Sequence, residues 1–162
     1  MIPPDRLQRF PLACELSDDR LRAIASICRE RSYGPGQWIF EEGFPAKSVM
    51  LLEEGEVALT CRLENGREAS VGRAAAGELL GWSALLPPNR LTASALTKSP
   101  VRVIEIDAAE LRSLCDRDPA VGYVILQHVA RTLSQRLESA RVQLAVVSGM
   151  AAPQPATRGA PE

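Results

Sequence analysis

The sequence predicts an α+β fold in which an antiparallel β-roll or jelly-roll barrel lies between an N-terminal helix and a long C-terminal helix. Two observations predict this fold. Apolar residues recur at helical spacing in residues 17–31 and again after residue 107, whereas short segments separated by Gly and Pro fill residues 38–106. Many short strands with regular turn signals are typical of a small barrel or sandwich. A length of 162 residues, 46% of them hydrophobic, suits one compact domain.

The chain divides into three parts on this interpretation. Residues 1–16 form an N-terminal extension, and residues 17–148 form the domain, with its C-terminal helix starting at about residue 119. Residues 149–162 end in AAPQPATRGAPE, which is rich in Pro and Ala and has no apolar anchor. Such a composition predicts a disordered tail.

The first element of the domain is a helix in SDDRLRAIASICRER, which Ser17 can cap. Leu21, Ile24, Ala25 and Cys28 follow the i, i+3, i+4, i+7 spacing of an apolar helix face. The YGPGQ segment then ends the helix. The cysteines, at 14, 28, 61 and 115, form no metal-ligand spacing, so we expect buried free thiols rather than disulfides.

Short strands are expected at WIF, VMLLEE, EVALTCRL, EASVGR, TASALT and VRVIEI. In EVALTCRL the apolar residues alternate strictly with the others, which is typical of a half-buried strand. Asn65-Gly66 follows it and predicts a hairpin with a type I′ turn, because that turn needs positive φ at both central residues.

Helical spacing returns at the C-terminal end. Asp107 and Glu110 form a capping-box pattern, and Asp118-Pro119 combines a cap with a first-turn proline. The helix that starts there is expected to run to about Val147, where Ser148-Gly149 can end it. At about 1.5 Å per residue it is about 40 Å long, which exceeds the length of a small roll.

A heptad pattern runs along this helix, at Leu126, Ala130, Leu133, Leu137, Ala140, Leu144 and Val147. These residues either pack on the helix's own roll or contact a second helix. We expect Leu126 and Ala130 to pack on the roll. For Leu133, Leu137, Ala140 and Leu144, beyond the expected end of the roll, the pattern favours the interface of a parallel homodimer.

Composition excludes several classes of function. The 19 basic and 20 acidic residues give a net charge of −1, which argues against a generic nucleic-acid surface. Arg131, Arg136 and Arg141 are interpreted as a solvated helix face. His128 is the single histidine, so a histidine-rich metal centre is not expected, and no catalytic motif is present. The chain has no apolar run of membrane-spanning length and no signal-peptide pattern, so we expect a cytoplasmic protein without membrane contact.

The order of elements resembles the cyclic nucleotide-binding domain of the Crp/Fnr group of bacterial regulators. YGPGQWIFEEGFPAKSVMLLEEGEVAL resembles the family's first strands, with glycines at 36, 43, 55, 77 and 81 where the family turns its roll corners. AAAGELLGWSALL resembles its phosphate-binding cassette, and DPAVGYVILQHVARTLSQRLESAR resembles its C-helix. The resemblance covers residues 15–147 and implies a cupin-like double-stranded roll, a sensor or regulatory role and no enzymatic activity.

The resemblance also implies a set of ligand-binding residues: Gly81, Trp82, Ser83, Ala84, Leu85, Arg90, Thr92, Ala93 and Ser94. Two positions depart from the family pattern. Trp82 stands where the family has the glutamate that binds the ribose, and Leu91 stands where it has the phosphate-binding arginine, with Arg90 one position earlier. Trp82 either offers a stacking surface or fills an empty pocket. Arg90 reaches the pocket only after a small loop adjustment, because a shift of one residue on a strand reverses the side chain.

Two functions remain open at this level. The first is a non-enzymatic sensor that binds a cyclic nucleotide or another small anionic ligand, with cAMP and cGMP as the candidates and no cofactor certain, and that signals through C-helix dimerisation about a hinge at Cys115–Pro119. The alternative is a ligandless dimeric protein-interaction module. A partner protein with an output domain is compatible with both. The helix-turn-helix domain of the Crp/Fnr group has no counterpart in the residues after 148, so we expect no direct DNA binding.

Overall fold

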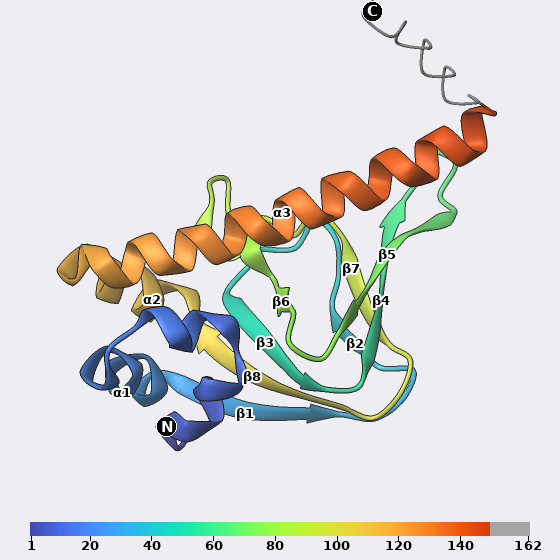
Figure 1. The fold of residues 1–162 in the computed structure, drawn as a ribbon. Helices are drawn as coiled ribbons and strands as arrows, with labels where there is room; N and C mark the ends of the chain where they lie inside the picture. Colours follow the sequence, from blue (N-terminus) through green and yellow to red (C-terminus); the bar gives the residue numbers. More distant parts are fainter. Residues whose placement is uncertain (150–162) are drawn as a thin grey trace, which may run out of the picture.

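The computed structural model describes residues 1–149, and its elements follow the predicted order from helix to roll to long helix (Figure 1). The helices are η1 Pro4–Arg9, η2 Pro11–Glu15, α1 Asp18–Ser26, η3 Trp82–Leu85, α2 Ala108–Arg117 and α3 Pro119–Ser148. The strands are β1 Cys28–Tyr33, β2 Trp38–Phe40, β3 Ser48–Glu54, β4 Glu56–Arg62, β5 Glu68–Ala75, β6 Leu79–Leu80, β7 Ser94–Thr97 and β8 Val101–Asp107.

The strands form two antiparallel sheets of four strands each, with orders β1-β8-β3-β6 and β2-β7-β4-β5. Side chains from both sheets meet in one apolar cluster that includes Leu52 of β3, Val57 of β4 and Val103 of β8. A second cluster joins the first sheet to α1, α2 and α3. The predicted α+β roll with an N-terminal helix and a long C-terminal helix is confirmed.

Residues 1–16, interpreted above as an extension, pack against the rest of the molecule. They form two short 3-10 helices, each with a proline in its first turn. Leu7, Phe10 and Leu12 are buried in the cluster that contains α1 and α3. Prolines at the starts of both segments fix φ and prevent one continuous helix, so no helical period is visible in the sequence.

The first predicted helix ends earlier than expected. It stops at Ser26, and Cys28–Tyr33 forms strand β1, which pairs with β8 in the register Cys28 with Ile106. The helical placement of Cys28 was wrong, although the residue is buried as expected. Polar residues follow Cys28 in the strand, so no alternation marks β1 in the sequence. Among the other thiols, Cys14 is exposed and Cys61 and Cys115 are half-buried.

The hairpin predicted at Asn65-Gly66 joins β4 to β5, but its turn is not type I′. Gly66 has a φ of 78°, whereas Asn65 is not among the residues of positive φ. The Gly66 amide donates to the carbonyl of Leu63 at 2.9 Å. A type I turn followed by a left-handed glycine produces this arrangement and closes the same pair of strands.

The predicted helix caps are present at the C-terminal end. Asp107 accepts hydrogen bonds from the amides of Ala109 and Glu110, and Asp118 accepts one from Ala120. Helix α3 ends at Gly149, which has a φ of 61°. The rest of the predicted disordered tail, residues 150–162, lies outside the described residues.

The first half of α3 is the part that the molecule buries, through Val121, Val124, Ile125 and Val129. The expectation that Leu126 packs on the roll was wrong, because the residue is 54% exposed, and Ala130 is exposed as well. The buried stripe and the heptad pattern therefore lie on neighbouring faces of the same helix.

An ion-pair cluster attaches η1 to the first sheet. Arg6 donates from Nε to Glu53 at 3.0 Å, and its terminal nitrogens bond to Glu53 and to Glu30. The Glu53 side chain is only 2% exposed, and the nearest other cation is Arg102, with its Nε 3.4 Å away. Removing Arg6 leaves a buried carboxylate with one weaker partner.

We expect Arg6→Ala to lower the free energy of unfolding by about 2–3 kcal/mol, because a buried carboxylate loses its bidentate partner. Urea denaturation measures the change. The matched control is Arg22→Ala, since Arg22 pairs with Asp19 on the exposed face of α1 and its loss is expected to cost less than about 0.5 kcal/mol. Equal losses in the two variants would contradict the structural role of Arg6.

Burial raises the pKa of the Cys28 thiol to about 12, and the thiol donates to the carbonyl of Ile24 at 3.1 Å. The unfolded thiol ionises first as the pH rises, so the stability linked to Cys28 is complete below pH 9.0 and is lost toward pH 12.

At about pH 8 we expect an aromatic disulfide reagent to label exposed Cys14 quickly and Cys28 only on unfolding. Mass spectrometry of the labelled peptides checks the order, and equal rates would refute it.

Candidate functional site

The turn that leads into η3 depends on Gly81. Its φ is 71°, and a Cβ placed there would lie 2.6 Å from the backbone oxygen of Ser48 on β3. An L side chain is therefore excluded both by conformation and by space. This close approach sets the start of η3, Trp82–Leu85, against the first sheet.

Beside this turn lies a cavity of about 430 Å³, called the cassette cavity below. The roll, η3 and α3 all contribute to its wall. The lining residues are Phe40, Leu59, Cys61, Val71, Leu80, Gly81, Trp82, Ser83, Leu91, Thr92, Ala93, Leu133, Arg136, Leu137 and Ala140. Its volume falls within the range of pockets that hold small organic ligands.

Five of the residues expected to bind a ligand line this cavity: Gly81, Trp82, Ser83, Thr92 and Ala93. The structure places the other four elsewhere. Ala84 is fully buried, and its carbonyl accepts hydrogen bonds from Asn89 and Arg112. Leu85 lines a separate cavity against α2, and the Ser94 hydroxyl accepts a hydrogen bond from the amide of Glu42 at 2.9 Å.

Arg90 is the fourth residue that does not line the cassette cavity. Its guanidinium donates to the carbonyl of Gly43 at 2.6 Å, and its backbone forms an isolated bridge with Pro45. Leu91, only 8% exposed, lines the cavity in its place. The shift of one residue between Arg90 and position 91 therefore determines which side chain faces the cavity, because neighbouring residues of an extended chain point in opposite directions.

Three of the residues predicted for the dimer interface, Leu133, Leu137 and Ala140, line the cassette cavity from α3. The roll therefore continues beneath α3 for two turns beyond the point where we expected it to end. Leu144 lies further along and is 67% exposed. Sequence reasoning placed these residues on one helix face correctly but could not see that the face borders the roll.

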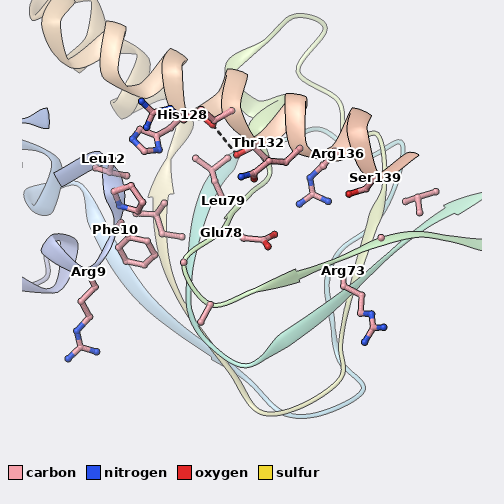
Figure 2. A pocket seen from close by; sticks show the side chains of 18 residues that line it. Arg9, Phe10, Leu12, Arg73, Glu78, Leu79, His128, Thr132, Arg136 and Ser139 are labelled. Atoms are coloured by element: carbon pink, nitrogen blue, oxygen red, sulfur yellow. Dashed lines mark hydrogen bonds between the residues drawn. The ribbon is translucent and has the colours of Figure 1, made fainter. Parts of the chain in front are cut away.

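Arg136 was expected to lie on a solvated helix face, and the structure places it elsewhere. Arg136 is half-buried and lines the cassette cavity, and its Nε is buried with no hydrogen-bond partner among the described residues. Burial lowers its pKa, an effect that the charge of Glu78 partly opposes. Figure 2 shows the Arg136 side chain extending from α3 toward Glu78. Its i+3 spacing from Leu133 is the sequence signal that could have found it.

The residues that line the cassette cavity carry one guanidinium, Arg136, and no carboxylate. Trp82 and Phe40 are the aromatic residues among them, and both also pack against the apolar core. Within residues 1–149 there is no group of three or more His, Cys, Asp or Glu side chains that could hold a metal ion. None of the helices in the same range is long and apolar enough to cross a membrane.

Residues 30–118 match the model of the cyclic nucleotide-binding domain family. This chain belongs to that family. A crystal structure from Geobacter metallireducens, of a protein described as a cyclic nucleotide-binding protein, superposes with a TM-score of 0.75 at 36% identity and covers 85% of this chain and 99% of its own. The expected resemblance to the family and its fold is confirmed.

Curated relatives carry the family domain within longer proteins. The CRP-like cAMP-activated global transcriptional regulator of Mycobacterium tuberculosis is 27% identical over 114 residues, which are 68% of this chain and 51% of the regulator. A Rhodopseudomonas palustris protein named as a potassium channel is 27% identical over 144 residues, which are 88% of this chain and 34% of that protein. The chain thus spans about a third to a half of these relatives.

Proposed function

We propose that this chain is a non-enzymatic regulatory domain that senses a small ligand in the cassette cavity. The observation that carries the proposal is the shared wall of that cavity: Trp82 and Ser83 line it from η3, while Leu133 and Leu137 line it from α3. A ligand held between them contacts the roll and the helix at once. Its binding free energy then differs between positions of α3, which is what a ligand-driven switch requires.

The lining of the cavity indicates the ligand class. Trp82 and the aliphatic residues suit a planar, largely apolar group, and Arg136 supplies one positive charge. A cyclic nucleotide has a planar base and one negative charge, so cAMP and cGMP are the first candidates. With Trp82 in place of the family's glutamate, the ribose hydroxyl has no carboxylate partner in this cavity, and we expect weak binding.

Movement of α3 is proposed to occur at its start. Asp118 separates α2 from α3, caps α3 and forms an ion pair with Arg20 of α1, with 2.7 Å between Nε and Oδ2. The Arg20 guanidinium holds the pKa of the Asp118 carboxyl below its ordinary value. The hinge proposed at Cys115–Pro119 therefore includes the ion pair between Arg20 and Asp118. A movement of α3 at this hinge would change the distance between these two side chains.

The far half of α3 is proposed to bind a second copy of the chain. Leu144 and Val147 continue the heptad pattern beyond the cassette cavity and are 67% and 85% exposed. Apolar residues at heptad spacing on an unpartnered helix are the pattern of a coiled-coil interface. Dimerisation through α3 would transmit a change in the cassette cavity to the partner chain, or to a partner protein with an output domain.

The second candidate function is a ligandless, dimeric interaction module. It is favoured by the two departures at the cavity, Trp82 and Leu91, together with the outward position of Arg90. In this case the roll and α3 serve only as a scaffold. The two functions differ in what happens when a cyclic nucleotide is added.

Calorimetric titration with cAMP and cGMP tests the proposal. We expect weak, saturable binding to the wild type, and binding to Trp82→Glu that is roughly 10- to 100-fold tighter, because a carboxylate hydrogen bond to the ribose contributes about 1.5–3 kcal/mol. Arg90→Ala is expected to change the affinity by less than about twofold, since Arg90 lies outside the cavity.

Trp38→Glu is the matched control for this titration, because Trp38 is the other tryptophan and does not line the cassette cavity. It is expected to leave the heat unchanged. If neither the folded wild type nor folded Trp82→Glu gives saturable heat at millimolar ligand, the sensor proposal fails and the ligandless module stands.

Leu144→Asp tests dimerisation without touching the cassette cavity. We expect a dimer for the wild type and a mass near that of the monomer for the variant at the same concentration, since a charge at a heptad position opposes helix pairing. Light scattering after size-exclusion chromatography measures the mass. Gln143→Asp introduces the same charge one residue away and is expected to remain dimeric, whereas a monomeric wild type would rule the interface out.

A further inference from the structure

A second cavity, of about 510 Å³, lies beneath α3 on the side toward the N-terminal helices, and is called the basic cavity below (Figure 2). Its walls come from Arg9–Leu12, from β5 at 71–73, from the β5–β6 turn at 76–79 and from α3. It meets the cassette cavity at Val71 and Arg136, which line both.

The face of α3 above the basic cavity is polar, although it points toward the roll. Val121, Val124 and Ile125 of the first turns are buried, as is usual for the inner face of a helix. Further along, the inner face changes character at His128. The residues of α3 that line the cavity are His128, Arg131, Thr132, Gln135, Arg136 and Ser139, at the spacing of a single helix face.

The basic cavity concentrates positive charge in a chain whose net charge is −1. Arg9, Arg73, Arg131 and Arg136 line it, and Glu78 is the carboxylate among the lining residues. Arg131 pairs with Glu15 and Arg73 pairs with Glu56, each at 3.2 Å. For Arg9 and Arg136, no carboxylate of residues 1–149 lies within ion-pair distance.

Two buried nitrogen atoms of these lining side chains have no hydrogen-bond partner within the described part of the chain: Nε of Arg136 and Nε2 of His128. The closest acidic group to His128 Nε2 is an oxygen of Glu15, at 3.7 Å. A buried guanidinium donor without a partner is destabilising, so a bound ligand that supplies a hydrogen-bond acceptor would stabilise this site. An acceptor that enters the basic cavity reaches both α3 and the N-terminal helices.

We propose that the basic cavity binds a small phosphorylated metabolite, with its phosphate oxygens at Arg136 and with exposed Arg9 adding positive charge at the edge of the cavity. Guanidinium groups match phosphate oxygens in pairs, and Thr132, Gln135 and Ser139 supply further polar groups along the same wall. A cavity of this volume suits a small molecule rather than a macromolecule. The basic cavity is distinct from the cassette cavity in its other lining residues, although the two share Val71 and Arg136.

Titration of the full chain with inorganic pyrophosphate at low ionic strength tests this site. Pyrophosphate has no base for Trp82 to contact, and Arg9 lines only the basic cavity, so a loss of affinity in Arg9→Gln distinguishes this site from the cassette cavity. We expect saturable binding that weakens roughly tenfold or more in Arg136→Gln, which removes a charge-assisted contact, and severalfold in Arg9→Gln, which removes a nearby positive charge. Arg9 lines the basic cavity and not the cassette cavity. Because this residue is exposed, the variant is expected to fold.

The matched control is Arg141→Gln, which removes the same charge from an exposed position on α3 that lines neither cavity. It is expected to change the affinity by less than about twofold. An equal loss in Arg141→Gln would show diffuse attraction by the helix and would overturn the proposal. Absence of saturable heat at about 10 mM pyrophosphate, far above the range of specific anion sites, would overturn it as well.

Discussion

The burial of Val121, Val124, Ile125 and Val129 is the contact on which the rest of the structure depends. These side chains fix the direction in which α3 leaves α2. A helix of 30 residues is rigid enough to carry that direction along its whole length, so its second half extends over the roll (Figure 1). Both cavities exist because the far half of α3 is held near the roll without being packed into it.

In the cassette, residues 77–95, backbone features determine the shape, and separate side-chain positions determine which ligand groups can be bound. Its shape depends on backbone features, namely the positive φ of Gly81 and the bonds that hold the Ala84 carbonyl to Asn89 and Arg112. Its proposed chemistry depends on positions 82 and 91, where by the resemblance described above Trp and Leu stand in place of a carboxylate and a guanidinium. The first set can be retained while the second changes, because a backbone turn does not need a particular side chain at its neighbours.

The sequence predicts the fold well where spacing or turn chemistry is local. The glycines at roll corners, the Asp118-Pro119 start of α3 and its end at Gly149 are all present. It predicts poorly where a tertiary contact decides, as in β1, whose polar residues pair with β8 at the edge of a sheet. The same limit applies to the site. The inward position of Arg136 and the outward position of Arg90 depend on how α3 and the loop after Pro88 pack on the roll. Local sequence patterns do not predict this packing.

Arg136 lines both cavities, so a ligand in one cavity would change the binding of a ligand in the other. One guanidinium cannot give its full charge to two anions, so an anion in either cavity would weaken the attraction felt by an anion in the other. Thermodynamic linkage makes this penalty equal in both directions. Two anionic ligands in neighbouring cavities would then oppose each other through a single side chain, and their ratio, rather than the concentration of either, would set which state of the domain is populated.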